Sequence, residues 1–196
     1  MLTPVRSTLR QRALEAALEV LRRDGWKGVT MRAVGEAADV SAAAIYRHFE
    51  NKDELWGEVV RETAALFRDY LFDGMEAPSP EERLWGALEA VRRFAVDEPK
   101  YYELLMLAPP TGTVRTYPEG YRENPQRTFR LLVDLVTENM EAGALGQDDA
   151  TDVAITLVSH AHGLIRLYRM DRFGDDQEQF ACFYRASFER IFKGLA

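Results

Sequence analysis

Three polar side chains of different chemistry, Tyr46, Arg47 and His48, closely follow a run of three alanines. Lys52 adds a cation four residues further along the chain. Arginine can donate two parallel hydrogen bonds to guanine in the DNA major groove, and alanine can contact the methyl group of thymine. Tyrosine and lysine side chains commonly donate hydrogen bonds to phosphate oxygens. This combination of residue types predicts a surface that binds double-stranded DNA.

Two short helices and a tight corner are expected to position these side chains. Thr30 is a suitable N-cap for the first helix, and residues 38–40 provide the corner. Ser41 then caps a second helix over residues 42–49. Two short helices joined by a turn of about three to four residues form a helix-turn-helix, and the second helix of that motif lies in the major groove.

Ordinary packing in a helical bundle is the alternative explanation of the same pattern. Ile45 and Phe49 are four residues apart, so they should share the buried face of the second helix. The three alanines keep one end of that helix slim, which lets its backbone approach base edges. A hairpin buried in a core has little reason to display tyrosine, arginine, histidine and lysine together. The pattern therefore favours DNA binding.

A helix on either side completes this unit. Residues 8–24 carry apolar side chains at helical spacing, and Gly25 is expected to end that helix. Asn51 lies three residues before Glu54, which is typical of a capping box at the start of a helix. That long helix, residues 51–75, is apolar on two sides, so we expect it to connect this unit to the rest of the chain.

Net charge differs between the two ends of the sequence. The chain carries 25 Lys and Arg against 32 Asp and Glu, a formal charge of −7. Residues 1–52 hold nine basic and six acidic side chains, a charge of +3, and the remainder holds 16 and 26, a charge of −10. A basic end on an acidic body orients a protein on DNA. Arg6, in a short arm over residues 1–7, either reaches a phosphate or a minor groove or belongs to a frayed terminus.

Other classes of function leave no signature. The sequence has no Gly-rich phosphate loop, Gly-x-Ser-x-Gly motif or His-Glu-x-x-His motif, so we expect neither an enzyme nor a bound cofactor or metal ion. His160 and His162 would lie about 200° apart on a helix, so they are badly placed to share a metal. The single cysteine, Cys182, is expected to be buried. No apolar run has the length of a membrane span and no signal peptide is evident, so we expect a cytoplasmic protein.

Helical patterns also cover the rest of the chain. After a break over residues 74–80, the sequence Ser-Pro-Glu-Glu from Ser79 is typical of a helix start. We expect helices over residues 80–96, 100–107, 125–142, 149–172 and 175–193, with a proline-rich loop over residues 108–124. Loops of such length are uncommon in compact domains unless they act as lids or binding elements.

The last two expected helices carry more apolar surface than one buried face requires. Isoleucine, leucine, valine and alanine cover over half of the first, and five aromatic side chains crowd the second between Phe180 and Phe192. A helix with so wide an apolar zone should bury its second side against a partner, which predicts a homodimer through these two helices. The alternative is that both sides are buried within one chain. A dimer would place two recognition helices at half-sites about 34–36 Å apart on a palindromic operator.

The helix-turn-helix sequence also resembles a known family. The segment VSAAAIYRHFENKDEL, preceded by VTMRAVGEAADV, closely resembles the DNA-binding domain of the TetR family of transcriptional regulators, and the resemblance covers about residues 8–60. It implies base contacts by Arg32, Ala42, Ala43 and Arg47, and phosphate contacts by Thr30, Tyr46, His48 and Lys52. Ser41 completes the predicted DNA-contacting set.

The family resemblance also implies an effector site in the second part of the chain. An aromatic and methionine-rich cavity with few polar groups suits a small apolar or aromatic molecule. The candidate lining residues are Trp85, Phe94, Tyr102, Met106, Tyr117, Tyr121, Phe129, Met140 and His162. The alternative is that these side chains, which recur at helical spacing, are plain core.

These observations predict an all-α protein with an N-terminal three-helix helix-turn-helix domain and a larger helical domain for ligand binding and dimerisation. The expected boundaries are residues 1–52, joined by the connecting helix 51–75, and residues 53–196. The expected function is a ligand-responsive transcriptional repressor. Two alternatives stay open: a DNA-binding factor of the same fold that has no small effector and serves a protein partner, and a small helical enzyme that uses the aromatic cavity.

Overall fold

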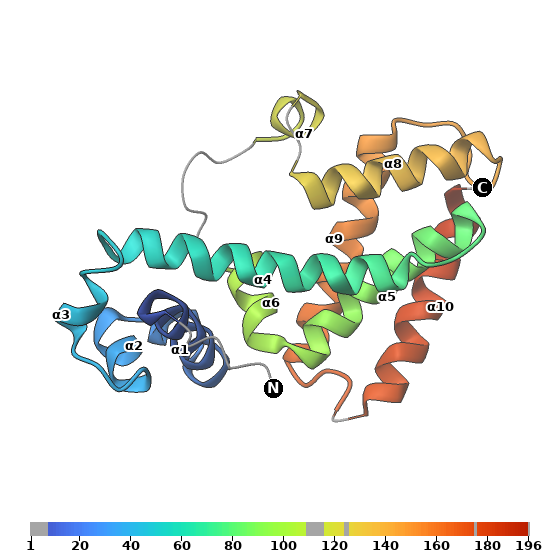
Figure 1. Cartoon of the computed structure of the whole chain (residues 1–196). Helices are drawn as coiled ribbons and strands as arrows, with labels where there is room; N and C mark the ends of the chain where they lie inside the picture. Colours follow the sequence, from blue (N-terminus) through green and yellow to red (C-terminus); the bar gives the residue numbers. More distant parts are fainter. Residues whose placement is uncertain (1–7, 109–115, 124–125, 175, 196) are drawn as a thin grey trace, which may run out of the picture. The chain divides into compact units, whose positions relative to one another are not determined.

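The structure is a computed structural model of the chain, and it describes residues 8–108, 116–123, 126–174 and 176–195. Within these residues all regular secondary structure is helical, which confirms the expected all-α class. The elements are α1 (Leu9–Asp24), the 3-10 helix η1 (Trp26–Gly28), α2 (Met31–Ala37), α3 (Ala42–Ile45), α4 (Lys52–Gly74), α5 (Pro80–Asp97), α6 (Pro99–Met106), α7 (Glu119–Glu123), α8 (Arg127–Glu141), α9 (Ala150–Arg169) and α10 (Gln177–Leu195), as labelled in Figure 1.

The chain folds into two compact units. The first, which we call the head, contains Met1–Phe67 and Asp97–Pro109, and the second, the body, contains Arg68–Val96 and Pro110–Ala196. Helix α4 therefore contributes residues to both units. Helix α6 belongs to the head, although α5 lies between it and α4 in the sequence.

Helix α1 begins at a capping box and ends at the glycine expected to stop it. The Thr8 hydroxyl accepts a hydrogen bond from the Gln11 amide, and the Gln11 side chain accepts one from the Thr8 amide at 2.8 Å, which completes a capping box. Gly25 ends the helix at φ 75°, a left-handed value that glycine adopts without steric cost. The buried face is made of Ala13, Ala16, Ala17, Val20 and Leu21.

The helix-turn-helix has the expected caps but a shorter second helix. The Thr30 hydroxyl accepts from the Ala33 amide at 3.1 Å, and the Ser41 hydroxyl accepts from the Ala44 amide at 3.2 Å. Asp39 makes the corner at φ 54°. The α-helical geometry of α3 stops at Ile45, so the predicted extension to Phe49 is wrong. The Arg47 and His48 amides instead donate to carbonyls three residues earlier, at 3.3 and 2.9 Å, which makes tighter turns. The chain tightens here because it must turn into α4 within a few residues.

The body is built from the end of α4 together with α5, α7, α8, α9 and α10. Helix α5 begins at the predicted start with a capping box, because the Ser79 hydroxyl accepts from the Glu82 amide at 3.2 Å and the Glu82 carboxylate accepts from the Ser79 amide at 3.3 Å. The Asn139 amide on α8 donates to the Pro80 carbonyl at 2.9 Å, which ties α8 to the start of α5. The Tyr184 hydroxyl on α10 donates to the Leu88 carbonyl of α5 at 2.8 Å.

Large aromatic side chains fill the centre of the body. Phe94, Phe180, Tyr184 and Phe188 are fully buried, and Tyr184 and Phe188 lie with their ring centroids 4.9 Å apart. Burying one such side chain contributes about 1.5–3 kcal/mol to folding, so this group is a main source of the body's stability. Figure 1 shows α10 running beside α5, as these contacts require.

Three sequence expectations need correction or lie outside the described residues. Cys182 is exposed rather than buried, because the inward face of α10 follows Phe180 and Tyr184 and a position two residues after Phe180 points away from it. The expected loop over residues 108–124 contains a short helix, α7, while its residues 109–115 and 124 lie outside the described part of the chain. The N-terminal arm over residues 1–7, with Arg6, also lies outside it.

Candidate nucleic-acid interface

The predicted DNA-contacting residues are displayed on the surface of the head. Eight of the nine are exposed and Ala42 is half-buried: Thr30, Arg32, Ser41, Ala43, Tyr46, Arg47, His48 and Lys52. The side chains of Ile45 and Phe49, 0% and 1% exposed, point into the core of the head instead. The expectation that Ile45 and Phe49 face inward is confirmed, and the same periodicity turns the polar residues between them outward. Contact with DNA by these nine residues stays a prediction.

The corner of the helix-turn-helix depends on a close approach of backbone to Gly35. A Cβ added at Gly35 would lie 2.9 Å from the Val40 carbonyl oxygen and 3.1 Å from the Ala42 amide nitrogen. The Val40 amide donates back to the Gly35 carbonyl at 2.9 Å, which fixes this geometry. Any side chain here would push α3 away from α2 and would move the residues that follow.

Arg32, the predicted base-reading arginine of α2, is held by an acidic neighbour in this structure. Its Nε donates to Glu36 Oε1 at 2.9 Å, an i to i+4 pair along the same helix. This hydrogen bond to Glu36 raises the pKa of the Arg32 guanidinium. The Arg32 side chain is nevertheless 86% exposed, so it can turn from Glu36 to a base without disturbing the core.

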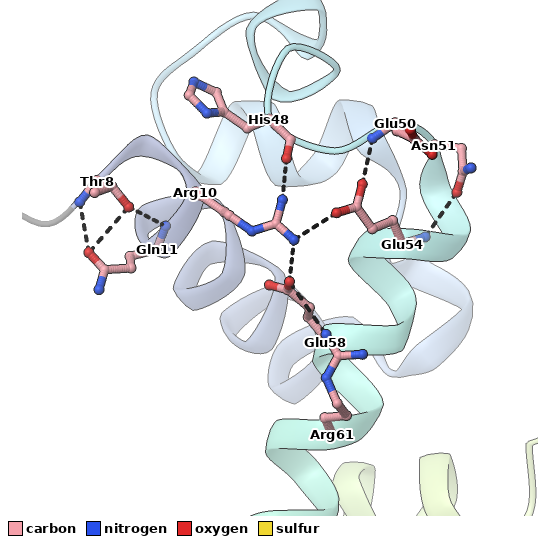
Figure 2. A network of polar contacts seen from close by, with 9 residues as sticks. All are labelled: Thr8, Arg10, Gln11, His48, Glu50, Asn51, Glu54, Glu58 and Arg61. Carbon is pink, nitrogen blue, oxygen red and sulfur yellow. Dashed lines mark hydrogen bonds and ion pairs between the residues drawn. The ribbon is translucent and has the colours of Figure 1, made fainter.

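A second arginine, Arg10 of α1, lies at the centre of a polar network that joins three elements of the head (Figure 2). Its guanidinium donates to the backbone carbonyl of His48, to Glu54 Oε1 at 2.7 Å and to Glu58 Oε1. It also lies over the Phe49 ring, 4.3 Å from the ring centroid. Sequence reasoning missed Arg10, because its partners are 38, 44 and 48 residues away and no local pattern connects them.

The start of α4 continues this network. Asn51 Oδ1 accepts from the Glu54 amide at 2.9 Å, as the capping pattern predicted. The Glu54 carboxylate accepts from the Glu50 amide at 2.6 Å, one residue earlier than a standard capping box would place it. Hydrogen bonds from Arg10 and then from the Glu50 amide lower the pKa of Glu54 below its ordinary value of 4.5.

Helix α6 packs on α1 within the head. The Tyr101 hydroxyl donates to the Leu18 carbonyl at 3.4 Å, and the Arg22 guanidinium lies 5.2 Å from the centroid of the Tyr101 ring. Arg22 also pairs with Glu98 at 3.7 Å. Burial raises the pKa of the Tyr101 hydroxyl. The head therefore includes α6 as well as α1, the helix-turn-helix and the start of α4. No local pattern in the sequence indicated this association between distant segments.

Part of the predicted effector-binding set forms a contiguous aromatic group in the body. The ring centroids of Tyr117 and Tyr121 are 6.5 Å apart, and those of Tyr121 and Phe129 are 5.1 Å apart. The Tyr117 hydroxyl donates to Asp152 Oδ1 at 2.8 Å, which secures this group to the first turn of α9. That hydrogen bond raises the pKa of the Tyr117 hydroxyl.

The other predicted effector residues lie elsewhere. Trp85 contacts Phe188 at 6.2 Å between ring centroids, and Phe94 contacts Tyr70 at 5.4 Å. His162 is half-buried on α9, and burial lowers its pKa. Tyr102 and Met106 belong to α6 and thus to the head.

Met140 borders a cavity of about 140 Å³ in the body, lined also by Leu145, Val153 and Leu195. This cavity is smaller than most ligand pockets, which measure about 300–1,000 Å³.

The described part of the chain contains neither a cluster of metal ligands nor a helix suited to a membrane. There, no group of three or more His, Cys, Asp or Glu side chains is arranged to hold a metal ion. None of the described helices combines the length and apolar character that crossing a membrane demands.

Comparisons with known proteins agree with this architecture. Residues 13–59 match the family described as "Bacterial regulatory proteins, tetR family", and residues 84–191 match "Tetracyclin repressor-like, C-terminal domain". The HTH-type transcriptional repressor KstR of Rhodococcus jostii is 33% identical over 166 residues, which cover 74% of this chain and 77% of that protein.

Solved structures resemble the chain in fold. A protein with unknown function from Rhodococcus sp. RHA1 superposes with a TM-score of 0.80 at 23% identity and covers 100% of both chains. The transcriptional regulator FadR of Bacillus subtilis, solved in complex with stearoyl-CoA, superposes with a TM-score of 0.69 at 15% identity over 94% of this chain and 98% of its own.

Proposed function

The chain belongs to the TetR family of DNA-binding transcriptional repressors, and we propose that it binds a palindromic operator as a homodimer and is released by a small apolar or aromatic effector. As a member of this family it is a transcriptional regulator and not an enzyme. Its place of action would be the cytoplasm, where the bacterial chromosome lies.

One observation carries the DNA-binding part of the proposal. Ile45 and Phe49 are buried, while Tyr46, Arg47 and His48 between them are exposed. The two buried side chains anchor this segment, so its hydrogen-bond donors face solvent in a fixed position. Specificity would come from Arg32 and Arg47, which suit guanine, from the alanines, which suit thymine methyl groups, and from DNA shape. Thr30, Tyr46, His48 and Lys52 would hold phosphates.

Exposed apolar side chains near the junction of α9 and α10 support a homodimer through these helices. Leu167, Met170 and Phe183 are 43%, 51% and 43% exposed, although side chains of this kind are usually buried. The Phe183 ring centroid lies 5.3 Å from that of Phe173, which in turn lies 5.2 Å from that of the buried Phe180. The exposed side chains are therefore continuous with the buried aromatic centre of the body. A two-fold interface here would pair two heads for two half-sites.

The effector would act in the body. Tyr117, Tyr121 and Phe129 offer an aromatic surface, and the Bacillus subtilis relative in fold was solved with a molecule that carries a long apolar chain. Helix α4 is continuous through residues of both units, so a shift of its body end would reach the head. An effector must prefer the released state by a few kcal/mol to act as a switch.

We assign these roles to residues 1–52 for DNA binding, with the connecting helix from residue 51 to 75, and to residues 53–196 for effector binding and dimerisation. Three measurements on the full chain test the proposal. Duplexes selected from a random library should share a palindrome, the free chain should sediment as a dimer, and a thermal-shift screen of fatty acids, acyl-CoAs and aromatic compounds should yield a molecule that also lowers DNA affinity. A monomer that selects no common duplex would refute it.

A further inference from the structure

Arg10 joins three separate parts of the head through one side chain. Its guanidinium donates to the His48 carbonyl at the end of the exposed segment Tyr46–His48, to Glu54 in the first turn of α4 and to Glu58 in the second turn (Figure 2). The flat face of the same group lies on Phe49, which is buried. Glu58 is shared with Arg61 at 3.4 Å, so the network continues along α4.

The chemistry of this contact requires arginine. The guanidinium has five donors in a fixed planar arrangement, so it can serve a carbonyl and two carboxylates at once in a single geometry. A lysine ammonium carries the same charge but has no planar fork and cannot stack on Phe49 in the same way. Arginine at this position therefore fixes directions as well as distances.

Stability alone is a weak explanation of the network. The Arg10 side chain is 38% exposed, Glu54 is 36% exposed and Glu58 is 17% exposed, and ion pairs that include an arginine this exposed contribute little to folding because water screens them. Its placement is more informative: the backbone atom it holds belongs to His48, between the exposed Tyr46 to His48 segment and the first turn of α4.

We propose that Arg10 is a positioning residue for DNA recognition, which fixes the segment Tyr46–His48 relative to the first two turns of α4. The inference rests on DNA binding by the head. Any displacement of α4 would move Glu54 and Glu58, and Arg10 would carry that displacement to the His48 carbonyl. The Arg10 guanidinium therefore couples the position of α4 directly to that of the side chains predicted to contact DNA.

Arg10 itself is a poor phosphate ligand in this arrangement. Two carboxylates already neutralise its charge, and its donors point toward them and toward a carbonyl. Loss of a phosphate-binding cation reduces the slope of log affinity against log salt by about one. Loss of a positioning residue should leave this slope unchanged, so the two roles can be separated by experiment.

The experiment compares Arg10→Met and Arg10→Lys with the parent chain. The probe is a duplex that the parent selects from a random library, and a scrambled duplex of equal length measures non-specific binding. We expect Arg10→Met to weaken selected-duplex binding by about tenfold or more, the size of one or two lost charge-assisted hydrogen bonds, with the salt slope and scrambled-duplex affinity unchanged. Arg10→Lys should recover only part of the loss.

Arg12→Met is the matched control, because Arg12 is an exposed arginine on the same helix and its loss changes the net charge equally. Glu58→Gln should produce part of the Arg10→Met effect, and the double variant should lose less than the sum. Urea unfolding of each variant at the same pH measures stability separately.

Three results would overturn the inference. An equal loss on both duplexes with a smaller salt slope would make Arg10 a phosphate ligand. A lower unfolding midpoint with unchanged affinity of the folded chain would make it a structural contact only. An unchanged affinity of Arg10→Met for the selected duplex would show that Arg10 has no role in DNA recognition. A parent chain that selects no duplex would instead refute DNA recognition itself, and this inference with it.

Discussion

Gly74, at the end of α4, and Gly86, in α5, approach each other backbone to backbone. A Cβ added at Gly86 would lie 1.6 Å from the Gly74 carbonyl oxygen, and a Cβ added at Gly74 would lie 2.4 Å from the Gly86 carbonyl oxygen. Neither position can accept a side chain unless the two helices move apart. The close crossing of α4 and α5 within the body is therefore possible only because both residues are glycine.

The first prediction concerns this crossing. Gly86→Ala should destabilise the chain by about 1–3 kcal/mol, because backbone atoms must shift to admit the methyl group. The measurement is the midpoint of urea unfolding, and the slope of the unfolding free energy against urea concentration should stay unchanged. Gly57→Ala is the control: its Cβ would meet only the tip of Arg61 at 3.5 Å, so alanine in this helix should stabilise by about 0.5–1 kcal/mol. Equal effects of the two substitutions would contradict the close crossing.

The second prediction concerns Arg32 and its partner Glu36. Arg32→Ala should cost about 1–3 kcal/mol of operator affinity and relax the preference at one base pair. Glu36→Gln should strengthen binding severalfold, because it frees the guanidinium and removes a negative charge near the phosphates. Fluorescence anisotropy on the selected duplex and its single-base variants measures both. A uniform loss on every duplex for Arg32→Ala would assign Arg32 to phosphate.

The third prediction concerns the proposed dimer interface. Phe183→Glu places a charge on an exposed aromatic position of α10, so it should dissociate the dimer and weaken operator binding, while each chain stays folded. Analytical ultracentrifugation and circular dichroism measure the two properties. Gln179→Glu, at an exposed polar position of the same helix, should leave the dimer intact. A Phe183→Glu dimer of unchanged affinity would place the interface elsewhere.

The fourth prediction concerns pH. Burial lowers the pKa of His162 below its ordinary value of 6.5. The folded state therefore favours the neutral ring, so the contribution of His162 to the stability of the body is fully present above pH 6.5 and is lost as the pH falls through the lowered pKa. We expect the fall in unfolding free energy between pH 7.5 and roughly pH 5 to be smaller in His162→Gln. His48→Gln, an exposed position in the head, is the matched control. An unchanged fall in His162→Gln would contradict the assignment.

Local chemistry explains what the sequence made predictable. The caps at Thr30, Ser41 and Asn51 depend on neighbours three residues away, so each could be assigned from a few letters of sequence. The inward direction of Ile45 and Phe49 follows from helical periodicity alone. The family resemblance added the roles of individual side chains, which local patterns do not supply.

Long-range packing explains what stayed hidden. Arg10 meets partners up to 48 residues away, and Tyr101 meets Leu18 across 83 residues, so neither contact leaves a local pattern. The burial expected for Cys182 was wrong because the wide apolar zone of α10 does not reveal which side faces the core. The predicted effector residues are mostly aromatic, but they lie in several separate places. Aromatic side chains at helical spacing also pack in ordinary cores, so their residue type alone does not identify a binding site.

Sedimentation velocity of the chain with a selected palindromic duplex, repeated from low to high salt, tests the central claim most directly. Two exposed heads on one dimer predict two chains, or a multiple of two, per duplex and an affinity that falls steeply and linearly on a log–log plot as salt rises. A single chain per duplex at micromolar concentration, or an affinity that salt does not change, would contradict the account.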